Sequence, residues 1–435
     1  MIGGEDMQQL ADEKVFKDPI HSFVRVTDML IWQLIETPEF QRLRRIKQLG
    51  GTHIVYPTAE HSRFSHSLGV YFIAHRMIDI LNKQGAGFTE TDRMLILCAA
   101  LLHDLGHGPF SHSFESVLGI DHEDFTRRIL LEDTRINQLL EEYEAGFASK
   151  VSDVIEKKHP NGLIVSLISS EIDADRLDYL LRDSYFSGTP YGEIDLERIL
   201  RTMRALNEKV VFKYSGMHAL EDYLLSRYQM YWQVYLHDCS VSFNSLIKSL
   251  LSRIRMLLEN GYEFKCSMYL FEAMFLKEPV DIDAYLRMDD GVITTYAGFF
   301  LAEEDAILRD LARRFLNRGL FDEFEYIQNE GTGTLISKLM HEMEQAEINT
   351  DFYLFNNHHQ QSTYDYYEKE SDETIDLLMP DGMIREISSV SNIIQGIVNA
   401  PKHKSTLFLP LDVVKKSNRA EKIIEILEEL IGRTY

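Results

Sequence analysis

The chain has 435 residues and a formal net charge of −24, and 45% of its residues are hydrophobic, including 24 phenylalanines and 21 tyrosines. The acidic excess argues against general nucleic-acid binding, which needs a basic surface to displace counterions from phosphates. A small polyphosphate is not excluded, because a metal and a few arginines can hold one. No stretch reaches the roughly 18 uncharged apolar residues of a membrane span, and the segment MIGGEDMQQLADEK lacks the pattern of a signal peptide. With only three widely spaced cysteines, we expect a cytoplasmic protein with reduced thiols.

The first 260 residues are predicted to be mainly helical. A hairpin is expected over residues 14–26, where Asp18-Pro19 supplies turn chemistry between two short alternating runs. The helical patterns that follow cover residues 27–36, 38–48, 62–81, 91–104, 169–183 and 217–256, with one further helix beginning at Asp121. Thr91 and Asp121 are the expected N-caps of their helices.

Beyond about Tyr262 the pattern becomes that of an α+β region. Strand-like runs are expected over residues 323–327, 351–355 and 406–411, and helices over residues 301–316 and 419–431. We therefore predict a mostly α protein, with a helical core over residues 1–260 and a smaller α+β region over residues 261–435. The second region is expected to pack on the core and to take part in oligomer contacts.

The segment LCAALLHDLGHGPFSHSFE, residues 97–115, stands out because an apolar run ends in His103-Asp104 and is then broken by glycines. The run is long enough for a buried helix, so its polar end is expected at the edge of a core. Burying an imidazole beside a carboxylate is costly unless something binds both, and a divalent metal is the usual solution. The alternative is a helix C-terminus where the helix dipole favours a cationic histidine. A second dipeptide of this kind, His237-Asp238, has neither the glycine break nor neighbouring histidines.

Three further motifs accompany this segment. They are FQRLRRIKQLGG, RFSHSLGV and IDADRLDYLLRD. In this order the motifs resemble those of the HD-domain phosphohydrolases, and more narrowly the deoxynucleoside triphosphate triphosphohydrolase family that includes the vertebrate SAM-and-HD-domain enzyme. The resemblance runs from Lys14 to about Tyr235 and makes residues 1–260 an HD-type core. Only about 13 residues precede Lys14, so we expect a relative without the SAM domain.

The resemblance implies one divalent metal at the HD site. The implied ligands are His66, His103, Asp104 and Asp175. By spacing alone Asp173 and Asp178 compete with Asp175; the motif selects Asp175, and it leaves Asp173 as a helix cap and Asp178 as an ion-pair residue. Two imidazoles and two carboxylates suit Mn, Mg, Fe, Ni or Zn, with positions left open for water and phosphate.

The reaction that the resemblance implies is hydrolysis of a dNTP at the α-phosphate, which releases deoxynucleoside and inorganic triphosphate and controls dNTP pools. Such cleavage needs stabilised charge, an aligned nucleophile and a proton for the leaving oxygen. Arg63, one helical turn before His66, is expected to hold a phosphate. The proton donor is expected among His107, His112, His122 and Glu115. We favour His112, or His122 backed by Glu115.

Substrate recognition carries over from the same family residue by residue. The matching positions are Gln48, Leu49, Arg63, Arg176, Tyr179, Asp183, Arg227 and Tyr235. Gln48 and Asp183 match residues that bind the 3′-hydroxyl. Leu49 and Tyr235 match residues that crowd the 2′ position and exclude ribose.

The phosphate end of the substrate has its own matches and departures. Arg227 matches the arginine at the terminal phosphates, and Tyr179 matches a tyrosine over the phosphates and sugar. Arg176 stands where the family has a lysine, and Tyr231 stands where the vertebrate pattern has a histidine.

The resemblance also implies regulation by dGTP or GTP, bound between subunits of a homotetramer or a dimer of dimers. The positions that match the activator site are Lys14, Val15, Glu36, Gln41 and Arg44. Glu36 replaces an aspartate that reads the guanine edge. The alternative interpretation is that LRRIK forms an ordinary basic helix face.

Two other functions remain open at this stage. One is another HD phosphohydrolase, a nucleotidase or a phosphodiesterase, although the three cations Arg63, Arg176 and Arg227 exceed what a monophosphate needs. The other is a nucleotide-sensing oligomer with weak catalysis, which the complete ligand set disfavours. Neither a membrane nor a stable nucleic-acid partner is expected.

Overall fold

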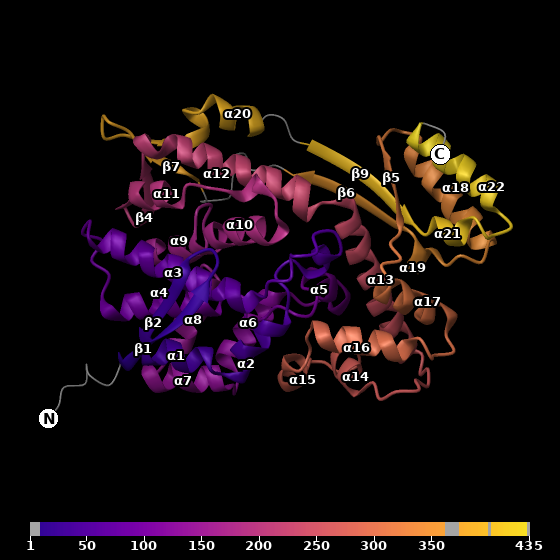
Figure 1. The fold of residues 1–435 in the computed structure, drawn as a ribbon, viewed down its shortest axis with the longest axis horizontal. Coiled ribbons are helices and arrows are strands. Elements are labelled where there is room, and N and C mark those ends of the chain that lie inside the picture. Colours follow the sequence, from indigo (N-terminus) through magenta and orange to yellow (C-terminus); the bar gives the residue numbers. More distant parts are fainter. Residues whose placement is uncertain (1–8, 362–373, 399–401, 433–435) are drawn as a thin grey trace. The chain divides into compact units, whose positions relative to one another are not determined.

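The structure, a computed structural model, describes residues 9–361, 374–398 and 402–432 (Figure 1). The chain forms two compact units and crosses between them several times. The first unit comprises Met1–Ser111, Gly119–Val234 and Thr363–Asn399. The second unit comprises His112–Leu118, Tyr235–Ser362 and Ala400–Tyr435. Most described residues are helical and the strands form three small sheets, which confirms the predicted mostly α fold.

The first unit begins with the predicted hairpin, β1 (Gln9–Asp18) and β2 (Ser22–Asp28), which pair antiparallel. The Asp18 carboxylate closes the turn by accepting hydrogen bonds from the backbone N–H groups of Ile20 and His21, at 2.9 Å each. Such local bonds are the reason that aspartate favours turns.

The connection from the hairpin to the central helices is less helical than predicted. It contains α1 (Met29–Ile35), α2 (Pro38–Arg42) and the 3-10 turns η1 (Leu43–Arg45) and η2 (Gly50–Ile54). The helix expected to continue to Gln48 ends earlier, because residues 46–48 pair with residues 61–63. The N–H of Gln48 donates to the carbonyl of His61 at 2.9 Å, and the N–H of Arg63 donates to that of Ile46 at 3.0 Å.

The core of the first unit is built on α3 (Arg63–Asn82), α4 (Glu90–Leu102) and α10 (Ala174–Ser187), with α3 packed against both of the others. Residues 94–102 of α4 are all buried, as expected for the apolar run. The cap of α4 is Thr89 rather than Thr91, because Thr89 and Asp92 form a reciprocal capping box.

The remaining elements of this unit surround the core helices or form a small sheet. The helices are α6 (His122–Leu131), α7 (Arg135–Tyr143), α8 (Phe147–Ile155), α9 (Gly162–Ile168), η3 (Pro190–Gly192), α11 (Leu196–Thr202), η4 (Tyr214–Gly216), α12 (Met217–Met230), η5 (Tyr231–Tyr235, at the unit boundary), η6 (Ile387–Ser389) and α20 (Asn392–Val398). The strands are β3 (Met203–Leu206), β4 (Lys209–Lys213), β7 (Asp376–Leu378) and β8 (Ile384–Glu386). They pair in the order β3-β4-β7-β8, and β4 with β7 is the parallel pair.

The second unit combines helices with a three-stranded antiparallel sheet of order β5-β9-β6. Its helices are α5 (His112–Leu118), α13 (Asp238–Glu259), α14 (Tyr269–Phe275), α15 (Ile282–Leu286), α16 (Asp290–Phe300), α17 (Ala306–Leu316), α18 (Thr332–Gln345), α19 (Thr350–Tyr353), α21 (Leu411–Val414) and α22 (Ala420–Ile431). Its strands are β5 (Asp322–Tyr326), β6 (Phe355–Gln361) and β9 (Lys402–Leu409).

Three predicted elements in the later part of the chain differ in the structure. The helix expected from residue 301 begins only at Ala306, because the Asp305 side chain caps α17. The run 351–355 is mostly helical, because the Asn349 side chain caps α19, and the strand begins only at Phe355. The helix predicted over residues 217–256 is interrupted after η5, since His237 is extended and its ring accepts a hydrogen bond from the N–H of Cys239.

Helices α3 and α10 approach closely around a buried carboxylate. A Cβ atom on Gly69 would lie 1.9 Å from Oδ1 of Asp178, so only glycine fits there. Asp178 accepts hydrogen bonds from Nε and Nη2 of Arg182 at 2.8 and 3.0 Å, and from His21 at 2.6 Å. Arg182 also donates to Asp18 of the hairpin turn at 2.8 Å. These ion pairs join the hairpin to the two helices in the interior.

We expect Arg182→Ala to destabilise the protein strongly. It would leave Asp178 buried with a charge no longer balanced, and breaking such a pair costs about 3–5 kcal/mol. Thermal and urea unfolding of the metal-free protein would measure the loss.

The matched control is Arg76→Ala, which breaks the solvent-exposed pair between Arg76 and Glu197. This substitution should cost less than about 1 kcal/mol. Equal losses for the two variants would contradict a stabilising role for the interior pairs.

Candidate functional site

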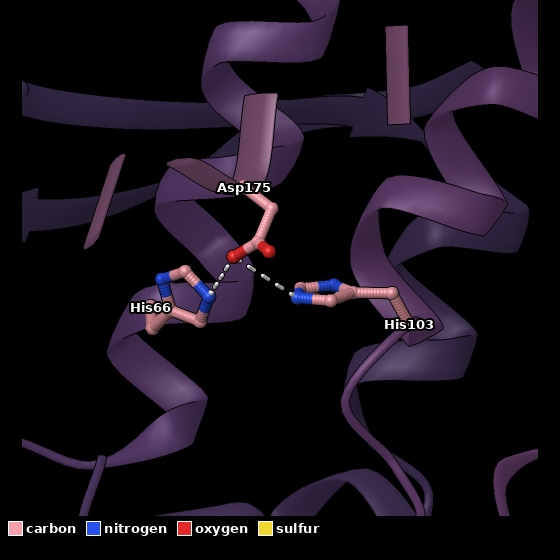
Figure 2. Close-up of side chains that lie close together, drawn as sticks. All are labelled: His66, His103 and Asp175. Carbon is pink, nitrogen blue, oxygen red and sulfur yellow. Dashed lines mark ion pairs between the residues drawn. The ribbon is translucent and has the colours of Figure 1, made fainter. Parts of the chain in front are cut away.

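The predicted metal ligands come from three elements of the first unit. His66 lies in the first turn of α3, His103 ends α4, and Asp175 lies in the first turn of α10. Figure 2 shows the Asp175 carboxylate between the two rings. Its Oδ1 atom lies 2.9 Å from Nε2 of His66 and 3.6 Å from Nε2 of His103. One ligand atom from each residue lies within 4.8 Å of the others, a spacing that could hold a metal ion.

Asp104, the fourth predicted ligand, faces the same two nitrogens. Its Oδ1 atom lies 3.4 Å from Nε2 of His103, and its Oδ2 atom lies 3.8 Å from Nε2 of His66. Oδ2 also accepts a hydrogen bond of 2.6 Å from Nη1 of Arg63. The structure therefore brings all four predicted ligands together, with Arg63 beside them.

The hydrogen bonds around the two histidines fit metal binding. Nδ1 of His66 is held by Asp178 at 2.8 Å, and Nδ1 of His103 is held by the carbonyl of Ala100 at 2.9 Å. Both Nε2 atoms are buried and face carboxylate oxygens, and neither forms a well-aligned hydrogen bond within the described part of the chain. A buried nitrogen without a hydrogen bond is costly, whereas a metal would use its lone pair. The donor set of two nitrogens and two carboxylates suits a divalent metal.

The electrostatics of the metal-free cluster favour a retained proton. Burial lowers the pKa of His66, but the carboxylates of Asp175 and Asp178 outweigh burial and raise it to about 10. Burial raises the pKa of Asp175, but His103 and His66 together hold it well below its usual range. A metal that binds here must therefore displace a proton from the histidine.

Asp173 and Asp178 have the supporting roles expected from the sequence. Asp173 is the N-cap of α10 and accepts a hydrogen bond of 2.7 Å from the N–H of Arg176, which confirms its assignment as a cap. Asp178 forms the expected ion pair and also orients the His66 ring. That second contact was not foreseen, although Asp178 follows Asp175 by three residues and helical spacing places both beside α3.

The arginines expected to hold phosphates are paired with oxygen atoms. Arg63 contacts Asp104 and donates to Oγ of Ser111 at 2.8 Å. Arg176 pairs with Asp173 at 2.5 Å, and Arg227 pairs with Glu171 at 2.5 Å. Helices α10 and α12, which carry Arg176 and Arg227, both belong to the first unit.

The loop after Asp104 brings two of the expected catalytic histidines together. A Cβ atom on Gly106 would lie 2.0 Å from the carbonyl oxygen of His122, so the missing side chain allows the loop to pack on α6. The rings of His107 and His122 stack with centroids 3.8 Å apart, and Nε2 of His107 lies 3.3 Å from Oδ1 of Asp104.

The other two expected catalytic residues lie in α5, which belongs to the second unit. Nδ1 of His112 is 3.1 Å from the Glu115 carboxylate, and most of the His112 side chain is exposed.

The sugar-binding candidates are also divided between the units. Tyr179 and Asp183 follow Asp175 along one face of α10, at spacings of four and eight residues. Gln48 and Leu49 are half-buried beside η2, and Oε1 of Gln48 is buried with no hydrogen bond to any described residue. Tyr235 ends η5 and belongs to the second unit.

The residues expected to bind an activator cluster at the N-terminal end of the first unit. Lys14 and Val15 are exposed on β1, with Nζ of Lys14 5.5 Å from the centre of the Trp32 ring. Arg44 donates to the side chain of Gln41 at 2.8 Å. Glu36 is exposed at the end of α1.

Comparisons with known proteins identify related domains in this chain. A family model described as the HD domain matches residues 63–183, and a model described as the HD associated region matches residues 194–261. The protein YwfO of Bacillus subtilis is 46% identical over 98% of this chain and 99% of its own length. A solved phosphohydrolase structure from Bacteroides thetaiotaomicron, 27% identical, has a TM-score of 0.81 and covers 92% of this chain and 100% of its own.

A relative from Dictyostelium discoideum, named deoxynucleoside triphosphate triphosphohydrolase SAMHD1 homolog, is 33% identical over 56% of this chain and 49% of its own length. The chain therefore belongs to the HD-domain family of metal-dependent phosphohydrolases, among the members related to SAMHD1. Within the described residues, every helix is too short or too polar to cross a membrane.

Metal binding should release a proton and strengthen as the pH rises. His66 of the metal-free protein, with its pKa of about 10, is protonated at neutral pH and must lose that proton to bind metal. Between pH 6.5 and 8.5 the affinity for Mn²⁺ should rise by about tenfold per pH unit for one released proton. Calorimetry in buffers of different ionisation enthalpy measures both quantities.

The control for this measurement uses two histidines of α3. His66→Ala should lose tight binding and the proton release, whereas His75→Ala should keep both, because His75 pairs with Asp79 away from the cluster. An affinity independent of pH in the unmodified protein would contradict the predicted protonation.

Proposed function

We propose that this protein hydrolyses deoxynucleoside triphosphates at the α-phosphate, giving deoxynucleoside and inorganic triphosphate. The observation that carries the proposal is the pair of buried Nε2 atoms, of His66 and His103, facing the carboxylates of Asp104 and Asp175. The name of the Dictyostelium relative supports this substrate class.

The metal would be held by His66, His103, Asp104 and Asp175. A divalent ion there supplies Lewis-acid polarisation of the α-phosphate and lowers the pKa of a nearby water. The mixed ligand set is compatible with Mn, Mg, Fe, Ni or Zn.

Three arginines would bind the triphosphate. Arg63, fixed by Asp104 and Ser111, is the cation next to the ligands and would hold the α-phosphate. Arg176 and Arg227 would hold the outer phosphates through charge-assisted hydrogen bonds. A phosphate would replace the oxygen partners that these two side chains have now.

The leaving 5′-oxygen would take its proton from the histidine group. His122, stacked on His107, is favoured by the 3.3 Å contact of His107 with Asp104, which places the stacked pair next to the ligands. His112, paired with Glu115, is the other candidate.

The deoxyribose would be recognised by its 3′-hydroxyl group and by the absence of a 2′-hydroxyl group. Gln48 and Asp183 would bind the 3′-hydroxyl, Leu49 and Tyr235 would crowd the 2′ position, and Tyr179 would lie over the sugar and phosphates. A site built to bond a substrate hydroxyl discriminates strongly against an analogue that lacks it.

Product analysis by chromatography tests the reaction. With Mn²⁺ and a mixture of dNTPs and GTP, we expect deoxynucleoside and triphosphate as products. Asp104→Ala should reduce the rate by more than about 100-fold, which exceeds the usual effect of replacing a residue that only supports a metal ligand. Asp238→Ala is the matched control, because it alters the second His-Asp dipeptide, where Asp238 pairs with Lys404.

Other products would redirect the proposal. Monophosphate and pyrophosphate, or orthophosphate, would identify another HD phosphohydrolase. Nucleotide-dependent assembly without hydrolysis under any metal would identify a sensing oligomer.

We also propose that dGTP or GTP activates the enzyme by promoting a homotetramer. Glu36 is exposed at the end of α1 and lines a surface hollow of about 240 Å³ with Trp32 and Arg135. Lys14, Val15, Gln41 and Arg44 would complete the activator site. The enzyme would serve dNTP pool control in the cytoplasm.

Glu36→Ala should raise the GTP concentration needed for half-activation by about 10- to 100-fold, the usual cost of a lost hydrogen bond to a charged group. Rates and light-scattering masses measured across GTP concentrations provide the test. Glu197→Ala, which alters an exposed glutamate paired with Arg76, is the control. Activity that is fully expressed on a single pyrimidine dNTP would contradict the activator.

A further inference from the structure

His61, which no motif singled out, is a buried histidine held by α10. Its Nε2 atom lies 2.8 Å from Oδ1 of Asp183, and both side chains are almost completely buried. Its ring stacks on Phe186 with centroids 4.7 Å apart and an angle of 18° between the planes. Asp183 and Phe186 are three residues apart on α10, so the helix fixes both the position and the plane of the imidazole.

The contacts of the ring assign its proton. A carboxylate accepts hydrogen bonds, so Nε2 of His61 is the donor to Asp183. The Nδ1 atom is buried, and no described residue forms a hydrogen bond with it. A purely structural histidine usually satisfies both nitrogens when it is buried. This ring instead leaves one nitrogen unsatisfied while it holds one carboxylate.

The backbone of His61 supports the other residue proposed to bind the sugar. Its carbonyl accepts a hydrogen bond of 2.9 Å from the N–H of Gln48, whose side-chain Oε1 is buried and makes no hydrogen bond within the described residues. Two residues further on, Arg63 donates to Asp104. His61 therefore contacts both residues proposed to bind the sugar. Its backbone carbonyl binds the Gln48 N–H, and its ring binds the Asp183 carboxylate.

We propose that His61 is a positioning residue for the substrate's sugar hydroxyl. Its Nε2–H holds one oxygen of Asp183 and so orients the carboxylate to accept a hydrogen bond from that hydroxyl. A deoxynucleotide carries one such group on its sugar ring, the 3′-hydroxyl, so His61 sets the preference for substrates that bear it. The inference rests on the proposed hydrolysis of dNTPs.

The test compares two substitutions and two substrates. His61→Phe keeps a ring to stack on Phe186 and removes the donor, whereas His61→Gln places an N–H near the Nε2 position. kcat and KM are measured with Mn²⁺ on a dNTP and on its 2′,3′-dideoxy counterpart, in the presence of GTP.

We expect His61→Phe to lower kcat/KM for the dNTP by about 10- to 100-fold, the range for a lost hydrogen bond to a charged group. The kcat/KM for the dideoxy substrate should change by less than about threefold, because that substrate has no 3′-hydroxyl. His61→Gln should recover most of the loss. His75→Phe, which replaces a histidine of α3, should leave the kinetics of both substrates unchanged. Should His61→Phe fail to fold, His61→Asn, whose amide is too short to reach the Nε2 position, carries the same comparison.

Each other outcome overturns the inference. Equal losses on both substrates would make His61 a structural residue, and no loss on either would remove it from recognition, while the proposed function stands in both cases. An unmodified protein that cleaves no dNTP under any metal or activator would overturn the proposed function, and the inference with it.

Discussion

The candidate metal centre depends on one buried carboxylate, that of Asp178. It accepts hydrogen bonds from His66, Arg182 and His21, which belong to α3, α10 and the hairpin turn. Burial raises the pKa of Asp178, but Arg182, His21 and His66 hold it well below its usual range, so the group stays ionised. The same carboxylate lies between α3 and α10 and fixes which nitrogen of His66 carries the hydrogen. The geometry of the metal ligands therefore depends on a residue that does not itself bind the metal.

Close packing at two glycines gives the helices and the loop their positions. Gly69 lets α3 approach the Asp178–Arg182 pair, and Gly106 lets the loop after Asp104 rest on α6. Both glycines lie near a histidine of the site. Gly69 is on α3 with His66, and Gly106 directly precedes His107 in the loop. Arg63 is likewise held by Asp104 and Ser111 before any substrate binds, which reduces the reorganisation that binding requires.

Local patterns in the sequence were sufficient to predict the hairpin, the buried run of α4, the cap at Asp173 and the family of the chain. They failed where contacts between distant segments decide the structure. Residues 46–48 leave the helical path because residues 61–63 pair with them, and α19 replaces a predicted strand because Asn349 caps it. His61 carried no signal of its own, because its partners lie 13 residues before it and 122 residues after it. The catalytic and substrate-binding assignments stay predictions.

The path of the chain between the two units bears on how the protein is made. The first unit takes its last strands and helix from Thr363–Asn399, and its parallel pair joins Phe212 of β4 to Leu377 of β7. Contacts so distant in sequence form late, because a long loop must close before they contribute. During synthesis the first unit therefore cannot complete its sheet until most of the second unit has left the ribosome. A nascent chain stalled before β7 would expose the edge of β4 to solvent and would be prone to aggregate.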